Sequence, residues 1–352
     1  DSVFPLYGGV GSGASDASDA ISILQSLEDA GFSTNGSLSD LYRSYCSERP
    51  AMTIKAQDWT LPEPPKDKYT DELIDEAKSF SDTAMIVLGR SGGEGADLPT
   101  DMNAVIKGTY DIRKENLIAA AVTENYGYTN ASYTNNGGYD DFAEGETYLD
   151  LSRTERDMID LVCDQFEQVI VVINSANAMN LSFVDEYDAI GAVILAPGAG
   201  ATGMEALGQI LNGSVNPSGR TVDTFVKDFA EVPSFNNIGN FSWNNVDDLK
   251  DQIAKSDAAY EGNLAFVDYA EGIYVGYKYF ETASEEGAIE YDDIVQCPFG
   301  YGLSYTSFER EISGFDQKAD TVTVKVKVTN TGSYPGKEVV QVYLQKPYTD
   351  YD

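Results

Sequence analysis

The stretch that most constrains the fold is residues 83–100, TAMIVLGRSGGEGADLPT. Its apolar run, residues 84–88, is typical of a buried strand. Glycines in the loop that follows surround one carboxylate, Glu94. An open α/β sheet presents catalytic side chains in this way, on loops at the carboxyl edge of its strands. A glycine-rich surface turn would give the same short motif, so the rest of the chain has to decide.

Short apolar runs alternate with amphipathic segments along most of the chain. We expect strands over residues 84–88, 169–173, 192–196 and 222–226, and helices over residues 20–27, 38–45, 71–80, 183–187 and 204–211. Ser152 and Glu155 form a capping box that opens a further helix. Residues 269–280 indicate a half-buried strand. This alternation predicts a doubly wound α/β sandwich, an open and mostly parallel sheet with helices on both faces.

After residue 305 the sequence changes in character. Residues 321–329 alternate valine with lysine and threonine, as half-exposed antiparallel strands do, and residues 338–344 indicate another strand. A β-sandwich needs about seven strands in about 100 residues. We therefore expect an α/β domain over residues 1–304 and the truncated start of a β-sandwich over residues 305–352. The chain is then part of a longer protein.

The formal net charge of −35 argues against nucleic acid and anionic membranes as partners, because their phosphates would be repelled. No apolar run approaches the ~18 residues of a membrane-spanning helix. The three cysteines, Cys46, Cys163 and Cys297, fit neither a disulfide scaffold nor a zinc site. Histidine is absent, which excludes Ser-His and Cys-His catalysis. Acid–base chemistry therefore falls to Asp, Glu, Lys or Tyr, and we expect no metal and no cofactor.

Two other segments allow more than one interpretation. Residues 101–147 are rich in Asn, Tyr, Gly and Asp, and we expect a long solvated insertion whose tyrosines could stack on sugars. Residues 7–13, YGGVGSG, precede a helix and could bind an anion. They lack the Lys-Ser/Thr ending of a phosphate loop, so a nucleotide-binding function ranks last.

Seven motifs then occur in one order: YGGVGSG, GRSGGEGADLP, YLDLSRTERDMIDLV, VIVVINSAN, AVILAPGAGATGMEALGQILNGSVNPSGRTVDTF, YAEGIYVGYKYFE and FGYGLSYTSFE. Together they resemble glycoside hydrolase family 3, the β-glucosidase type of enzyme, from about Leu6 to Glu309. Residues 101–147 are the main departure. Residues 328–345, VTNTGSYPGKEVVQVYLQ, resemble the start of that family's fibronectin type III-like domain.

The resemblance implies a retaining hydrolase built on two carboxylates. Glu94 corresponds to the general acid/base of the family, and Ser12 to the serine that contacts the bound sugar. Asp97 keeps the aspartate that follows this glutamate in the family, but Leu98 replaces its arginine. We add Asp97 and the aromatic Trp243 as further candidates for substrate binding.

The nucleophile of the family is an aspartate in a TIM-barrel domain, and no fitting motif for it occurs in this chain. Gln57-Asp58-Trp59 stands in the wrong context. We expect the barrel to come from the same gene or from a partner chain, and both a permuted domain order and a truncation fit the sequence. The chain alone should then be inactive, although its full protein is an enzyme.

The expected function is that of a β-glucosidase component, acting on terminal non-reducing β-D-glucosyl residues of oligosaccharides or aryl glycosides. The alternative is a non-catalytic carbohydrate-binding or interaction module. A homo-oligomer is compatible with the sequence. Acidity and polysaccharide chemistry favour secretion or the cell envelope, and a cytoplasmic location stays open.

Overall fold

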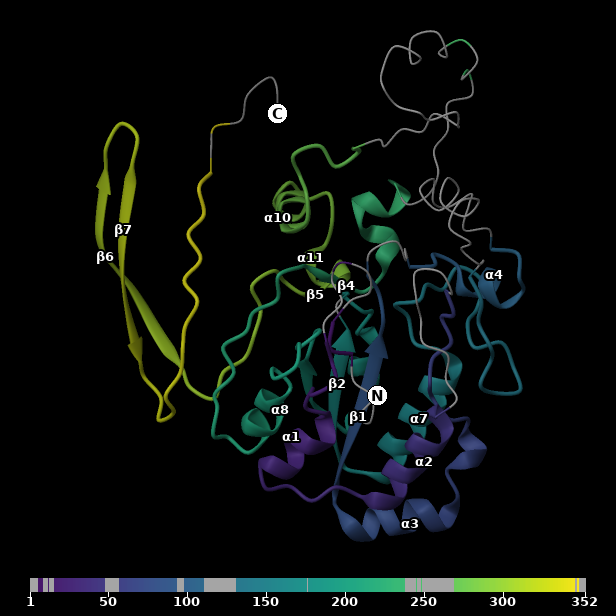
Figure 1. The fold of residues 1–352 in the computed structure, drawn as a ribbon. Helices are drawn as coiled ribbons and strands as arrows, with labels where there is room; N and C mark the ends of the chain where they lie inside the picture. The colour runs from purple at the N-terminus through teal and green to yellow at the C-terminus, as the bar shows by residue number, and fades with distance from the viewer. Residues whose placement is uncertain are drawn as a thin grey trace.

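The computed structural model describes residues 6–8, 12, 16–47, 57–93, 98–110, 131–175, 177–237, 245, 248, 269–345 and 347. Its centre is a parallel sheet with the order β1-β2-β3 (Figure 1). The strands are β1 (Thr83–Arg90), β2 (Gln168–Ser175) and β3 (Ile190–Leu195). The register of β1 and β2 runs from Thr83 opposite Gln168 to Arg90 opposite Ser175, so both strands end at the same edge. Three of the predicted strands are thereby confirmed.

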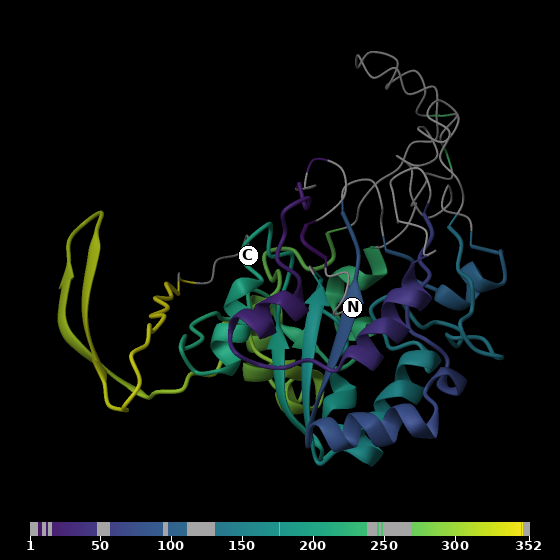
Figure 2. The ribbon, with the colours of Figure 1, turned by 60° about the horizontal axis from the view of Figure 1, so that its bottom comes forward.

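Helices cover both faces of this sheet (Figures 1 and 2). Successive residues of a strand point to opposite faces, and β1 accordingly contributes Ile86 and Leu88 to one core and Met85 and Val87 to the other. The helices are α1 (Ile23–Asp29), α2 (Gly36–Cys46), α3 (Asp71–Phe80), α7 (Arg153–Gln165) and α8 (Glu205–Leu211). α3 and α7 pack on the first core, and α1 and α8 pack on the second. The predicted α/β sandwich is confirmed.

α1 and α8 approach closely at Gly208. A Cβ on Gly208 would lie 2.1 Å from the carbonyl oxygen of Ser26 and 2.7 Å from the Cβ of Ala30. The Ser26 hydroxyl joins the two helices, because it accepts from the Gly208 N–H at 2.9 Å and donates to the Glu205 carbonyl at 3.2 Å. The contact depends on the missing side chain.

In the α/β region, two segments predicted as strands differ in the structure. Within residues 222–226 only β4 (Phe225–Val226) forms, and it pairs antiparallel with β5 (Val295–Cys297) outside the parallel sheet. Residues 269–280 form turns followed by the start of helix α10 (Tyr277–Glu285). Phe280, at 2% exposure, packs on β4 and β5. Short helical elements complete the described parts of the α/β region: η2 (Lys66–Lys68), η3 (Ser182–Glu186), η4 (Phe229–Glu231), η5 (Pro233–Asn237) and α11 (Tyr291–Ile294).

The described parts of the predicted insertion are not simply solvated. They contain α4 (Met102–Ile106) and a compact core formed with residues 59–61. The buried members of this separate core, the Trp59 core, are Trp59, Leu61, Met102, Val105, Ala131, Phe142 and Tyr148. Residues 111–130 lie outside the described residues. The expectation of a solvated insertion is therefore wrong for the buried part of this segment, whereas residues 107–109, 138–140 and 143–145 are exposed as expected.

The last described part of the chain holds a two-stranded hairpin, β6 (Phe308–Gln317) with β7 (Val322–Asn330), which extends away from the α/β body (Figures 1 and 2). The strand predicted over residues 321–329 is confirmed, whereas residues 338–344 form no strand. Asn216 ties this part to the body: its Nδ2 donates to the Pro335 carbonyl at 3.0 Å and its Oδ1 accepts from the Tyr305 N–H at 2.8 Å. Among the helices of the described ranges, none combines the length and apolarity that a membrane crossing needs.

Candidate functional site

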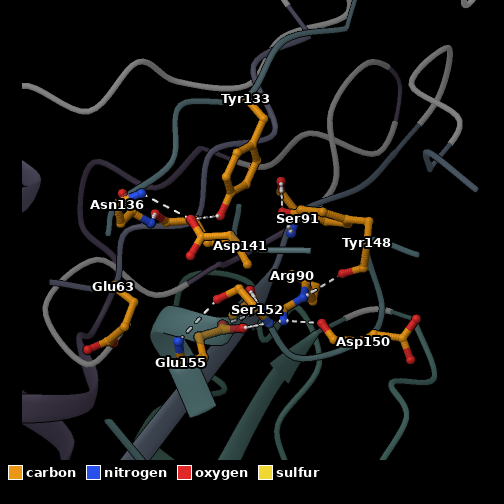
Figure 3. Close-up of polar contacts among 12 residues, drawn as sticks. Glu63, Arg90, Ser91, Tyr133, Asn136, Asp141, Tyr148, Asp150, Ser152 and Glu155 are labelled. Atoms are coloured by element: carbon orange, nitrogen blue, oxygen red, sulfur yellow. Dashed lines mark hydrogen bonds and ion pairs between the residues drawn. The ribbon is translucent and has the colours of Figure 1, made fainter. Parts of the chain in front are cut away.

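The carboxyl end of β1 is fixed by a buried ion pair. Arg90 ends the strand with its side chain 0% exposed, and Glu155 faces it from the first turn of α7 with 5% exposure. Nη1 donates to Oε1 and Nη2 donates to Oε2, both at 2.7 Å (Figure 3). Two parallel charge-assisted hydrogen bonds give such a pair geometric specificity as well as strength. The last residue of β1 is therefore locked to α7.

The other donors of Arg90 are also satisfied. Nε donates to the Tyr148 carbonyl at 2.7 Å, Nη2 to the Asp150 carbonyl at 2.8 Å and Nη1 to the Gly89 carbonyl at 2.9 Å. Burial by itself lowers the pKa of Arg90, but the Glu155 carboxylate and its hydrogen bonds raise that pKa above its usual value. The guanidinium is thus a permanent buried cation with all its N–H groups paired, which removes the cost of burying unpaired donors.

Glu155 stands in this place because of the way α7 begins. Ser152 caps the helix by accepting from the Glu155 N–H at 3.1 Å, and the Glu155 carboxylate accepts from the Ser152 N–H at 2.9 Å. Asp141, which is fully buried, accepts from the Thr154 hydroxyl at 2.5 Å and from the Tyr133 hydroxyl at 3.0 Å. The helix start that presents Glu155 is therefore anchored to residues 131–147.

Ser91 and Gly92 lead from β1 toward Glu94. The Ser91 N–H donates to the Tyr148 hydroxyl at 3.3 Å, and the Ser91 hydroxyl lies 3.2 Å from the same oxygen. A Cβ on Gly92 would lie 2.9 Å from Nδ2 of Asn177, so the loop passes close to the residues that follow β2. The first residues of the glycine loop are thus held between Tyr148 and Asn177.

The amino-terminal residues pack at the same edge of the sheet. Asn174 near the end of β2 accepts from the Leu6 N–H at 2.5 Å and donates to the Ala196 carbonyl at 2.8 Å. The Gly200 N–H donates to the Tyr7 carbonyl at 2.7 Å. The loops after β1, β2 and β3 and the segment beginning at Leu6 therefore converge at the carboxyl edge, where ligands of open α/β sheets bind.

Of the four predicted site residues, the structure describes one. Ser12 is described and exposed. Glu94, Asp97 and Trp243 lie outside the described residues. Across the ranges that the structure describes, no group of three or more His, Cys, Asp or Glu side chains is placed to hold a metal ion. The described chemistry of this edge consists of hydroxyl, amide and backbone groups, which suit hydrogen bonding to a polar ligand.

A second buried carboxyl, Glu63, lies near the ion pair in Figure 3. It is 6% exposed and accepts from the Tyr42 hydroxyl, at 3.1 Å to each oxygen, and from the Tyr69 hydroxyl. The hydroxyl oxygens of the two tyrosines are 2.5 Å apart. Burial raises the pKa of Glu63 to about 8; the Tyr69 and Tyr42 hydrogen bonds oppose this rise, and the nearby Glu155 charge adds to it. Glu63 therefore keeps its proton at neutral pH.

Sequence reasoning missed Arg90, Tyr148 and Glu63 as functional or structural centres, and assigned Glu155 only a capping role. A signal existed for Arg90, because a charged residue just beyond an apolar run, here after Gly89, implies either exposure or a buried partner. The partner itself could not be found from spacing, since Glu155 is 65 residues away in the sequence. Glu63 stands between Pro62 and Pro64, and no local pattern in the sequence indicates that it is buried.

Comparison with known proteins places the chain in a family. The model of the glycosyl hydrolase family 3 C-terminal domain matches residues 4–277. A β-glucosidase of Ruminococcus albus is 30% identical over 344 residues, which cover 96% of this chain and 28% of that protein. β-Glucosidase A of Butyrivibrio fibrisolvens is 32% identical over 292 residues, covering 79% of this chain and 29% of that protein. The chain thus spans less than a third of these relatives.

Solved structures agree. The β-glucosidase from Paenibacillus barengoltzii matches with a TM-score of 0.64 and 28% identity over 94% of this chain and 29% of that one. β-Glucosidase 3B from Thermotoga neapolitana, solved with glycerol, has the same fold at a TM-score of 0.63 and 24% identity, covering 95% of this chain and 37% of that one. Since the family model matches more than half of the chain, the chain belongs to glycosyl hydrolase family 3 and carries its C-terminal domain.

Proposed function

We propose that this chain supplies the general acid/base, Glu94, of a retaining β-glucosidase that hydrolyses terminal non-reducing β-D-glucosyl residues. In this proposal Ser12 contacts the bound sugar, and Asp97 and Trp243 contribute to substrate binding. The nucleophile comes from a TIM-barrel domain of the same gene or of a partner chain. Residues 1–304 form the α/β domain of this enzyme, and residues 305–352 begin its fibronectin type III-like domain.

The observation that carries the proposal is the family match over residues 4–277, which spans the GGEG loop. The residues just before Glu94 lie at the carboxyl end of β1, the edge at which an α/β sheet presents ligand-binding loops. Relatives that this chain resembles over most of its length carry the name β-glucosidase. Both the loop and the relatives support a glycosidase role.

The chemistry divides the work between two carboxyl groups. Retention needs these groups about 5–5.5 Å apart, on opposite sides of the anomeric carbon. One attacks carbon and forms a glycosyl-enzyme, while the other protonates the leaving oxygen and later takes a proton from water. Glu94 would perform the second task, for which its carboxyl must hold a proton when substrate binds. A nearby nucleophile carboxylate and a desolvated sugar would both favour that protonated form.

The direct test is Glu94→Gln in the full-length protein, compared on two substrates. The phenolate of an activated aryl β-glucoside can leave without being protonated. The sugar alkoxide that leaves from a β-linked disaccharide needs a proton from the acid. We expect kcat/KM for the disaccharide, which reports formation of the glycosyl-enzyme, to fall about 100-fold or more, within the range that general acids contribute, and kcat/KM for the aryl substrate to fall far less. Glu72→Gln, an exposed change on α3, is the matched control. Equal losses of kcat/KM on both substrates would reject the acid role.

A second experiment tests the division of labour. The purified chain is assayed on the aryl β-glucoside, and its intact mass is measured in the same sample. We expect no turnover, because the proposed nucleophile is elsewhere. Turnover that survives purification to one polypeptide and disappears in Glu94→Gln would mean that an Asp or Glu of this chain performs the attack.

A further inference from the structure

We propose that the Tyr148 hydroxyl is a positioning group for the catalytic acid, because it holds Ser91, three residues before Glu94 in the sequence. This inference rests on the proposed function of Glu94. It assigns no chemical step to Tyr148 itself. It concerns the described base of the loop, residues 90–93, and the Trp59 core that supports it.

Tyr148 contacts Ser91 through both the backbone and the side chain of that residue. The Ser91 N–H donates to the phenol oxygen at 3.3 Å, and the two hydroxyl oxygens are 3.2 Å apart. Gly92 and Gly93 follow, and neither carries a side chain. Ser91 is therefore the last residue before Glu94 whose side chain can anchor the loop.

The phenol that holds Ser91 is itself rigid. Tyr148 is 1% exposed and packs edge-on against Trp59, with ring centroids 4.8 Å apart. Its carbonyl accepts from Arg90 Nε at 2.7 Å, and the centroid of its ring lies 5.5 Å from the Arg90 guanidinium carbon (Figure 3). Arg90 is in turn locked to Glu155. Tyr148 is therefore fixed at its ring and at its backbone, and its hydroxyl is a fixed point for the loop.

A fixed point at Ser91 matters because general-acid catalysis depends on position. A displacement of about 1 Å at a reacting group can cost about 100-fold in rate. Gly92 and Gly93, which follow Ser91, leave the backbone more conformational freedom than residues that carry a side chain. The Tyr148 contacts reduce that freedom at the loop's entrance. Their loss should affect protonation of the leaving group more than the binding of substrate.

The test is Tyr148→Phe in the full-length protein, which removes one hydroxyl and keeps the ring packing and the carbonyl that Arg90 uses. We expect kcat for a β-linked disaccharide to fall about 10-fold, a part of the contribution of a well-placed acid, with KM changed less than about 2-fold. The value of kcat/KM for an activated aryl β-glucoside, which reports formation of the glycosyl-enzyme, should change by less than about 3-fold, because its leaving group needs little protonation.

Tyr133→Phe is the matched control, since it also removes one hydroxyl from the same region. Tyr133 packs on the same core but donates to Asp141 and not to the loop. A thermal unfolding curve of each variant shows whether it is folded. Ser91→Ala provides a second variant from the other side of the contact: it keeps the N–H bond to Tyr148, so we expect a smaller loss with the same dependence on leaving group.

The outcomes separate this inference from the function it rests on. If Glu94→Gln abolishes disaccharide hydrolysis and Tyr148→Phe matches Tyr133→Phe on both substrates, the positioning role is refuted and the acid role stands. If Tyr148→Phe lowers kcat/KM of both substrates equally, the residue acts through general stability and the inference is also refuted. If Glu94→Gln leaves the disaccharide rate unchanged, the proposed function itself fails.

Discussion

Replacing Glu63 by glutamine should change how the stability of the protein depends on pH. The folded chain keeps the Glu63 proton up to a pKa of about 8, whereas the ordinary pKa of the group is 4.5. Between these values the folded state binds one more proton than the unfolded state, so the free energy of unfolding falls as pH rises. Below pH 4.5 the Glu63 carboxyl is protonated in both the folded and the unfolded state. Above pH 8 both are ionised, and the folded form carries the full cost of the buried charge.

The size of the effect follows from the difference between the two pKa values. Each unit corresponds to about 1.4 kcal/mol, so the difference amounts to about 5 kcal/mol between pH 4 and pH 9. That is a large fraction of the 5–15 kcal/mol that stabilises an ordinary domain, as an order-of-magnitude figure. The side-chain amide of Glu63→Gln would stay neutral at every pH and can still accept from the phenols, so the variant loses this dependence.

The assay is urea unfolding of the full-length protein and of Glu63→Gln at intervals from pH 5 to pH 9. We expect the difference in unfolding free energy, variant minus wild type, to rise by about 1.4 kcal/mol per pH unit between pH 5 and pH 8. Glu72→Gln removes the same charge from the exposed surface of α3 and controls for the change in net charge. Parallel profiles for wild type and Glu63→Gln would refute the assignment of a protonated buried Glu63.

Two further substitutions test the packing of the α/β domain. Glu155→Gln keeps the capping box but leaves the Arg90 guanidinium buried without a counter-charge, so we expect unfolding free energy to fall by about 3–5 kcal/mol in denaturant titrations; a loss below about 1 kcal/mol would contradict the buried pair. Gly208→Ala pushes a Cβ against the Ser26 carbonyl and should lower the melting temperature by several degrees, at a cost of about 1–3 kcal/mol, whereas Gly36→Ala, with open space around it, should not.

The parts of the fold that the sequence predicts are those encoded by local periodicity. The run Ala84 to Leu88 is apolar throughout because β1 is covered on both faces, and such a run is informative by itself. The capping box at Ser152 is equally local and appears as predicted. The strand predicted over residues 269–280 is wrong because closely spaced aromatics satisfy a strand period and a helix period alike. Only packing on β4 and β5 selects the helix.

The polar interior could not be predicted in this way. Asp141 lies in a run of Asn, Gly, Tyr and Asp that composition assigns to a solvated loop, yet it is 0% exposed. Its carboxylate accepts from Tyr133 and Thr154, so these polar groups bond to one another inside the protein. Hydrogen-bonded polar clusters of this kind leave no periodic signal, because their members need complementary positions in space and not regular spacing in sequence.

The buried Arg90–Glu155 pair beside the glycine loop specifies how β1 and α7 are placed more than it adds to stability. A buried ion pair often contributes little net free energy compared with apolar residues of the same shape, because both charges lose their hydration. The Arg90–Glu155 pair nevertheless admits only one register of β1 against α7, since every N–H of the guanidinium has its own acceptor. An apolar pair could slide by a fraction of an ångström at small cost. The residues that enter the GGEG loop would then be held less closely, and the acid role that we propose for Glu94 depends on that positioning.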